Sequence, residues 1–292
     1  MEAYSIKDLE NLSGIKAHTI RIWEQRYHFL KPQRTQTNIR QYTPDELKTV
    51  LNVALLNKYG YRISQIDKMS ADEIRQRIIT LGTIHAQQER LVHELIQHLV
   101  DLNLEAFEQM LDEEIAAHGI DKTIPQLIFP FLEKIGILWM TNSVNPAQEH
   151  LVSNIIRRKL IVGIDSAYSP VKLKKTGLLF LPEGEFHELG LLHMHYLLRS
   201  RGITVFYLGA SIAMKDLAFL CSKKKPDFLY THLTSVPGNF SLDRFFRQFL
   251  QLCLSGTLIV TGQVFQQYRK KVPDQVVIRK SLPEVLGYIS AL

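Results

Sequence analysis

The chain is poor in cysteine: Cys221 and Cys253 are its only two among 292 residues, and their spacing is not that of a C-x-x-C motif. This scarcity argues against a disulfide framework or a thiolate metal site, and a reducing cytoplasm is the expected location. No window approaches eighteen uninterrupted apolar residues, and residues 1–4 lack the basic and apolar regions of a signal peptide. We therefore expect neither a membrane span nor secretion.

Motifs of the common enzyme classes are also missing. The sequence contains no G-x-S-x-G, no Walker-type loop, no G-x-G-x-x-G and no H-E-x-x-H. Hydrolases with an activated serine, nucleotide hydrolases, hydride-transfer enzymes and zinc peptidases therefore find no support. We expect a protein that is not an enzyme.

Charge divides what is present into three parts. The composition is 46% apolar and 22% charged, which is ordinary for a chain able to bury real cores. The net charge of +6 splits into +4 for residues 1–70, −6 for 71–170 and +8 for 171–292. Two or three domains suit this length. We place the boundaries at these charge changes, and read the lysine clusters of the last part as solvated surface rather than a second nucleic-acid site.

The first part has the pattern of a winged helix-turn-helix. Residues 5–12 predict a first helix, Ser13 and Gly14 a turn, and residues 19–27 a second helix that carries cations. A basic hairpin with Arg34 and Arg40 follows. In such modules the second helix enters the major groove and the wing meets phosphates. The blander alternative is a small helical domain with a solvated basic face.

This pattern closely resembles the MerR family of transcriptional regulators. The resemblance implies double-stranded DNA as partner and, because one module buries too little to be selective, a homo-oligomer on a repeated operator. Trp23 is expected to anchor the second helix in the core. The residues expected to contact bases or phosphates are His18, Thr19, Arg21, Arg26, Tyr27, Arg34, Arg40 and Tyr42.

The middle part is helical and acidic. Capping boxes at Thr43 with Glu46, and at Ser70 with Glu73, open two helices. Helical spacing then predicts four amphipathic helices, which favour a four-helix bundle that could be only a spacer or a dimerisation element. The helices are expected near 71–98, 102–117, 123–139 and 145–161. The histidines at 85, 93 and 98 are expected to be solvated.

The last part alternates short apolar strands with helices. This alternation predicts right-handed crossovers and a flavodoxin-like (Rossmann-like), doubly wound parallel sheet, so the chain as a whole is multidomain, α and α/β. Ligands of such sheets bind beyond the carboxyl ends of the strands. Strands are expected at 177–181, 203–208, 228–233, 258–260 and 276–278. Helices are expected at 189–200, 212–223, 242–254, 264–270 and 283–291.

One loop at that edge of the sheet carries candidate chemistry. Glu185, His187 and Gly190 follow the first strand. An imidazole can ligate a transition metal through one nitrogen while a carboxylate accepts a hydrogen bond from the other. Taken alone, His187 could equally be a surface histidine. His193 and His195 lie two residues apart on a helix, so they point to different faces and do not form a metal pair.

The same loop resembles the cobalamin-binding signature Asp-x-His-x-x-Gly, with Glu185 in place of the aspartate. Trp139, followed ten residues later by Glu149 and His150, is similar to the Trp-x9-Glu-His motif of MerR regulators that sense adenosylcobalamin, the CarH/LitR-type photoreceptors. The resemblance implies that His187 is the lower axial cobalt ligand. It also implies that the tryptophan motif covers the upper cobalt face, with the cofactor held between bundle and α/β domain.

Three positions depart from that family pattern. The Ser-x-Leu/Thr element aligns with His232, Leu233 and Thr234, and the Gly-Gly pair aligns with Thr261 and Gly262. In the family those glycines let the nucleotide tail of the cofactor pass close to the backbone, so a β-branched threonine threatens a clash. The light-sensing members have histidine directly after the tryptophan, where this chain has Met140. A bis-histidine photoproduct is therefore doubtful.

The resemblance as a whole implies a cytoplasmic DNA-binding regulator whose oligomeric state or DNA affinity responds to cobalamin, with adenosylcobalamin as the expected form. Two alternatives stay open. One is a regulator with a degenerate, cofactor-free sensor domain used for protein interaction. The other is a corrinoid carrier for methyl transfer, which has no use for a groove-reading helix. The cofactor-binding residues are expected to be Trp139, Glu149, His150, Glu185, His187, Gly190, His232, Thr234, Thr261 and Gly262.

Overall fold

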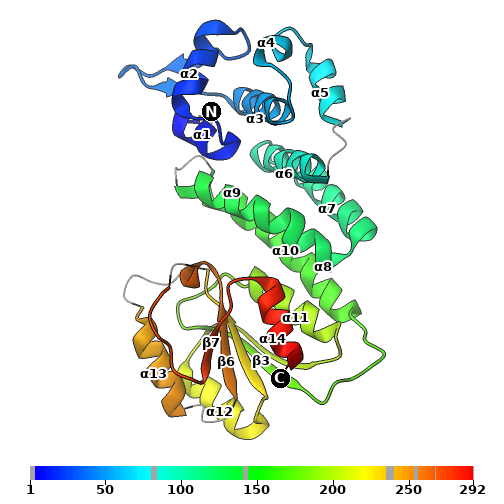
Figure 1. Cartoon of the computed structure of the whole chain (residues 1–292), viewed down its shortest axis with the longest axis vertical. Helices are drawn as coiled ribbons and strands as arrows, with labels where there is room; N and C mark the ends of the chain where they lie inside the picture. The colour runs from blue at the N-terminus through cyan, green and yellow to red at the C-terminus, as the bar shows by residue number, and fades with distance from the viewer. Residues whose placement is uncertain are drawn as a thin grey trace. The chain divides into compact units, whose positions relative to one another are not determined.

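The computed structural model describes residues 4–79, 84–140, 144–234, 240–252, 256–266 and 268–291. The chain forms two compact units, Met1–Ile155 and Ile156–Leu292 (Figure 1). The predicted DNA-binding part and most of the predicted bundle thus share the first unit. The finer division at residues 70 and 170 stays a prediction.

The first unit begins with the expected helix, turn, helix and hairpin. Gly14, which ends the first helix, has φ +74°, a conformation that glycine adopts without strain. Two short antiparallel strands form the wing, residues 33–41, and the capping boxes at Thr43 and Ser70 are both present. The elements are α1 (Ile6–Ser13), α2 (Ala17–Arg26), β1 (Gln33–Arg34), β2 (Arg40–Gln41), α3 (Pro44–Lys58), α4 (Ile63–Ile66) and α5 (Ala71–Ile79).

The predicted four-helix region is helical throughout its described part, with a different segmentation. Gly119, at φ +81°, separates the second and third predicted helices as expected. The third contains a π-helical turn that includes Pro125, whose missing N–H cannot complete the α-helical ladder. The elements are α6 (Ile84–Val100), α7 (Leu104–His118), α8 (Ile120–Thr123), η1 (Ile124–Ile128), α9 (Phe129–Met140) and α10 (Pro146–Ser166).

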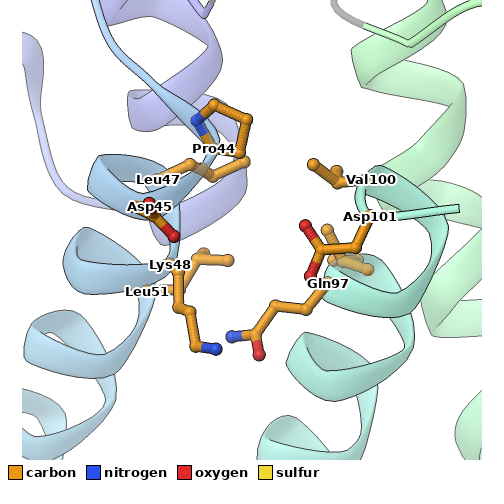
Figure 2. A pocket seen from close by; sticks show the side chains of 9 residues that line it. Pro44, Asp45, Leu47, Lys48, Leu51, Gln97, Val100 and Asp101 are labelled. Carbon is orange, nitrogen blue, oxygen red and sulfur yellow. The ribbon is translucent and has the colours of Figure 1, made fainter. Parts of the chain in front are cut away.

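Helices of the DNA-binding part and of the bundle pack directly on one another within the first unit, α3 on α6 and α1 on α9. Lys58 of α3 forms an ion pair with Glu89 of α6. Between these two helices lies a small pocket, in which Lys48 and Gln97 point toward one another (Figure 2). The α3–α6 contact therefore has an apolar core and a polar edge.

A partly buried polar contact joins α9, α6 and α1. The Lys134 ammonium donates a hydrogen bond to the carbonyl of Leu12 at 3.1 Å and lies 3.2 Å from Nε2 of His93. The expectation of a solvated His93 is wrong, because only 6% of this residue is exposed. Helix packing decides this point, since His93 faces α9 rather than solvent. His98 is half-buried, and the His85 side chain lies outside the described residues.

The second unit contains the predicted parallel sheet. Its strand order is β4-β3-β5-β6-β7 and every neighbouring pair is parallel, so both the sheet and the flavodoxin-like order are confirmed. The strands are β3 (Thr176–Pro182), β4 (Thr204–Ile212), β5 (Phe228–His232), β6 (Thr257–Thr261) and β7 (Val276–Ile278). The helices are α11 (Leu189–Arg199), α12 (Met214–Lys224), α13 (Leu242–Leu252) and α14 (Leu282–Ala291).

Apolar residues of successive strand positions supply two separate cores. Leu178 and Phe180 of β3 pack with α12 and α13 on one face of the sheet. Leu179 and Leu181 pack with α11 and α14 on the other. A strand buried on both faces needs such a continuous apolar run, and this is why β3 could be recognised in the sequence.

The expected helix at 264–270 is wrong. Only a 3₁₀ turn, η2 (Gln263–Phe265), is present in the described part of this segment. Phe265 is fully buried, and the ring of Tyr268 packs edge-on against Phe265 and Phe246. Aromatic packing therefore decides the local backbone here, over helix propensity.

Among the described residues, no helix is long and apolar enough to cross a membrane.

Candidate functional sites

Helix α2 presents a polar, cationic face to solvent. His18, Arg21 and Arg26 are exposed, as are Ile22 and Gln25 between them. Thr19 is half-buried, with its hydroxyl 3.3 Å from Nε2 of His18. The opposite face buries Ile20 and Trp23, which confirms the expected anchoring role of the tryptophan. Burial on one face leaves the other accessible to a ligand.

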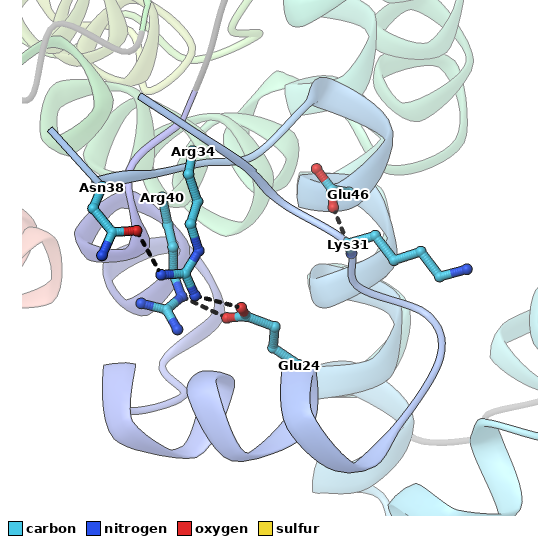
Figure 3. A network of polar contacts seen from close by, with 6 residues as sticks. All are labelled: Glu24, Lys31, Arg34, Asn38, Arg40 and Glu46. Atoms are coloured by element: carbon cyan, nitrogen blue, oxygen red, sulfur yellow. Dashed lines mark hydrogen bonds and ion pairs between the residues drawn. The ribbon is translucent and has the colours of Figure 1, made fainter. Parts of the chain in front are cut away.

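The wing is fixed to α2 by one carboxylate (Figure 3). Glu24 accepts a hydrogen bond from Nε of Arg40 at 2.6 Å and lies 3.5 Å from Nη2 of Arg34. Arg34 also donates to Oδ1 of Asn38 at 2.9 Å, and Asn38 holds the left-handed φ of +64° at the wing turn. Glu24 therefore orients both predicted wing arginines, a role that sequence reasoning missed.

A surface hollow lies among the start of α1, helix α2 and the wing. It is lined by Ser5, Ile6, Lys7, Arg21, Asn38, Ile39 and Arg40. Lys7 is exposed and Ile39, at the wing tip, is 60% exposed. The sequence analysis names neither residue as a DNA contact. The position of Lys7 on the polar face of α1 is the signal that could have made it a candidate.

Tyr42 does not fit the predicted contact with DNA. It is fully buried and its backbone pairs with Tyr4, so its phenol belongs to the core beneath the wing. Burial raises the pKa of Tyr42 to about 12. Tyr27 remains a candidate, because it is half-buried and stacks on Phe29 with ring centroids 5.9 Å apart.

In the second unit, the loop between β3 and α11 orients His187. Glu185 is 1% exposed, and its Oε1 accepts the backbone N–H groups of Phe186 and His187, both at 2.9 Å. The same oxygen lies 2.5 Å from Nδ1 of His187. The imidazole itself is 59% exposed. This is the predicted pairing of a carboxylate with one ring nitrogen, which presents Nε2 for ligation.

The end of β4 supports this loop. The backbone N–H of Ser211 donates to the Glu185 carbonyl at 3.1 Å, and the N–H of Gly184 donates to the Ser211 hydroxyl at 3.2 Å. At the start of α11, Glu188 pairs with Arg157 of α10 and accepts a hydrogen bond from the Tyr207 hydroxyl at 3.0 Å. The His187 loop is thus held on both sides.

The residues aligned with the other family elements lie at the ends of β5 and β6. Nδ1 of His232 is 2.9 Å from the Thr261 hydroxyl, which is 2.8 Å from the Tyr230 hydroxyl. The pKa of His232 is lowered to about 4 by burial. Thr234 is exposed. Gly262 has φ +107°, and its backbone lies close to that of Leu233.

His193 and His195 behave as predicted. His193 is 2% exposed, whereas the His195 ring stacks on Tyr207 with centroids 5.1 Å apart. Burial lowers the pKa of each to about 4. Across the described part of the chain, no group of three or more His, Cys, Asp or Glu residues could hold a metal ion.

The predicted upper-face residues all belong to the first unit. Trp139 and Met140 lie in the last turn of α9, and their side chains lie outside the described residues. Glu149, in the first turn of α10, pairs with the exposed His150 at 3.3 Å and with the Ser153 hydroxyl at 2.5 Å.

Comparison with known families bears on the DNA-binding face and on the helices upstream of the sheet, and the matched ranges do not include His187. Residues 4–73 match the MerR HTH family of regulatory proteins, and residues 91–162 match a B12 binding domain. The protein combines a MerR-type DNA-binding domain with a B12-binding domain. The family match in the B12-binding domain covers the helices α6 to α10, upstream of the sheet.

Known relatives of the chain are HTH-type transcriptional repressors. The chain is 29% identical over 232 residues to the HTH-type transcriptional repressor CarH of Myxococcus xanthus, covering 77% of each chain. It is 26% identical over 270 residues to the HTH-type transcriptional repressor CarA of the same organism, covering 91% of this chain and 89% of CarA. The solved monomethylamine corrinoid protein of Methanosarcina barkeri shares the fold, with a TM-score of 0.55 and 12% identity, covering 70% of this chain and all of that one.

The residues of the α/β unit fit one part of a cobalamin and not another. His187, oriented by the buried Glu185, fits the lower cobalt ligand. The positions aligned with the nucleotide-tail path do not show an open passage, because the His232 ring packs directly against Gly190.

Proposed function

We propose that this protein is a cytoplasmic transcriptional regulator that binds an operator through α2 and the wing and responds to a corrinoid ligated by His187. The observation that carries this proposal is the Glu185–His187 pair at the carboxyl end of the sheet, in a chain that also has an exposed cationic α2.

On the DNA side, α2 enters the major groove. The exposed side chains of His18, Arg21 and Arg26 then face base edges or groove phosphates. Arg34, held by Glu24 and Asn38, meets the phosphate backbone from the wing. Because phosphate contacts supply most of the sequence-independent affinity, binding weakens as salt rises.

On the ligand side, a bound corrinoid would supply a cobalt ion, and His187 would ligate it. Glu185 holds the Nδ1 proton of His187, which directs Nε2 outward and raises the basicity of the ring. The proposed form carries an adenosyl group on the cobalt, as adenosylcobalamin does. Binding shifts DNA affinity or oligomeric state only by the difference in ligand affinity between the two states.

Both parts of the proposal, DNA binding and corrinoid binding, are tested with the full-length protein. In a mobility shift with its own operator region, Arg21→Ala is expected to weaken binding by about tenfold or more, as for loss of a bidentate contact. Lys122→Ala, on the exposed end of α8, serves as the matched control and is expected to bind as wild type. Equal affinity of Arg21→Ala and wild type contradicts the placement of α2 in the groove.

For the cofactor, the visible spectrum of protein mixed with adenosylcobalamin in the dark is compared with that of His187→Ala. Wild type is expected to retain the corrinoid through gel filtration with the spectrum of imidazole ligation, and the variant to lose that spectrum. Identical behaviour of the two proteins contradicts ligation by His187.

The two alternatives are less well supported. A cofactor-free sensor domain is not favoured, because the chain matches a B12 binding domain and keeps the oriented His187. The solved corrinoid protein shares the fold over 70% of this chain, but a corrinoid carrier has no use for the exposed cations of α2.

A further inference from the structure

Beside the His187 loop, three side chains form a hydrogen-bonded group that the proposed ligation does not use. Two of them, Tyr230 and Thr261, are buried, and His232 is half-buried. We call Tyr230, His232 and Thr261 the His232 cluster. The Thr261 hydroxyl lies 2.9 Å from His232 Nδ1, 2.8 Å from the Tyr230 hydroxyl and 3.4 Å from the Thr231 carbonyl. The His232 imidazole is therefore bonded to a hydroxyl that two further partners orient, at the ends of β5 and β6.

The His232 ring occupies the space that Gly190 leaves on the first turn of α11. A Cβ added at Gly190 would lie 2.6 Å from Cδ2 and 2.8 Å from Nε2 of His232. At Gly262 the equivalent Cβ would lie 2.2 Å from the Leu233 carbonyl oxygen. Both glycines are therefore in close contact with this chain's own atoms.

If His187 ligates the cobalt, the displaced nucleotide base of a cobalamin needs space at this edge of the sheet. When a protein histidine becomes the lower cobalt ligand, the cofactor's own nucleotide base is displaced but stays tethered to the corrin ring. The base must then lie beyond the carboxyl ends of the strands, where ligands of doubly wound sheets bind. An aromatic base and the imidazole of His232 cannot occupy the same volume.

We propose that His232 makes the α/β unit selective for corrinoids without an inserted nucleotide base. The preferred ligand class is a cobinamide-type corrinoid, in which the lower cobalt face is open to His187 and no base competes for the place of His232. This inference rests on the proposed function, since it presupposes that His187 ligates cobalt.

The test compares adenosylcobinamide, which lacks the nucleotide, with adenosylcobalamin, and measures the dissociation constant of each in the dark for full-length wild type and His232→Ser. Cobinamide has no base to displace, so its intrinsic advantage is the same for both proteins and cancels in the comparison. Wild type is expected to bind adenosylcobinamide more tightly. The ratio of the dissociation constant of adenosylcobalamin to that of adenosylcobinamide measures this preference. His232→Ser is expected to reduce this ratio by about tenfold, through stronger binding of adenosylcobalamin alone.

Controls separate this inference from the function on which it rests. Thr261→Val removes only the hydroxyl that holds the imidazole, so it is expected to narrow the ratio in the same direction even if His232→Ser does not fold. The exposed His118→Ser is expected to leave the ratio at the wild-type value. A ratio unchanged in both cluster variants overturns the selectivity. Failure of folded wild type and variants to bind either corrinoid overturns the proposed function as well.

Discussion

At the scale of single residues, burial determines which histidines act as bases. His187 is exposed and oriented by a carboxylate, whereas His93, His193 and His232 lie in surroundings that disfavour the charged ring. Burial lowers the pKa of His93 to about 3, with a further contribution from the nearby Lys134 and Lys58. Their surroundings therefore disfavour the charged form of these three rings, whereas the His187 ring lies at the surface beside Glu185.

This burial predicts loss of stability in acid. The unfolded chain binds protons on these histidines below pH about 6.5, whereas the folded chain does not bind them until pH about 4 or lower. The free energy of unfolding is therefore constant above pH about 6.5 in this respect. It falls as pH drops below that value, by at most about 1.4 kcal/mol per pH unit for each buried histidine.

Urea denaturation between pH 7.5 and pH 4.5 measures this dependence. His93→Gln keeps a neutral polar group beside Lys134. This variant is expected to reduce the slope of the free energy of unfolding against pH by the contribution of one histidine. His118→Gln changes a histidine with a 57% exposed side chain and is expected to keep the full slope. A His93→Gln slope equal to that of wild type contradicts the buried, neutral state of His93.

At the scale of elements, side-chain caps place the ends of the DNA-binding helices. Glu46, in the first turn of α3, accepts a hydrogen bond from the Thr43 N–H at 2.8 Å. It also accepts one from the Lys31 N–H at 2.8 Å (Figure 3). The Thr43 hydroxyl in turn accepts the Glu46 N–H at 3.2 Å. One capping box thus starts α3 and also holds the chain that leads into the wing.

Thr43→Ala is expected to lower the free energy of unfolding by about 1 kcal/mol, because an orphan N–H of the first turn loses its acceptor. Thr49→Ala, in the interior of the same helix, is the matched control and is expected to cost little, since alanine is the better helix former. Thermal and urea denaturation of the two variants check this. Equal stability of the two variants contradicts the role of the cap.

At the scale of the first compact unit, the DNA-binding helices and the bundle share a buried interface. The Lys134 ammonium, on α9, contacts both the Leu12 carbonyl of α1 and the His93 ring of α6. Its pKa is lowered by burial, which reflects the cost of holding a cation there. Lys134 also lies five residues before Trp139 on α9, so one helix carries both a predicted sensing residue and the contact with the DNA-binding part.

Lys134→Met is expected to loosen α1 from α9, because the Leu12 carbonyl loses a charged donor while the apolar bulk is kept. Hydrogen exchange of the α1 amides is expected to become about fivefold faster, as for local opening made easier by about 1 kcal/mol. Exchange in α11, in the second unit, is expected to stay unchanged. The exposed Lys122→Met is the control. Unaltered α1 exchange in Lys134→Met contradicts the coupling.

Local patterns in the sequence were sufficient for much of this molecule. The apolar run of β3, the capping boxes at Thr43 and Ser70, and the stop at Gly119 each depend on near neighbours, so the elements they define could be predicted. The Glu185–His187 contact could also be predicted, because a two-residue separation on one loop keeps the carboxylate and the imidazole within reach.

What the sequence by itself determined, therefore, is the order of helices and strands, the parallel sheet, the cationic face of α2 and the oriented His187. Only the tertiary structure decided that Tyr42 and His93 are buried, that Glu24 orients the wing arginines, and that His232 fills the space beside Gly190. These latter facts depend on contacts between residues distant in the chain. Periodicity and motif spacing report which face of an element is apolar, but not which neighbouring element will cover it.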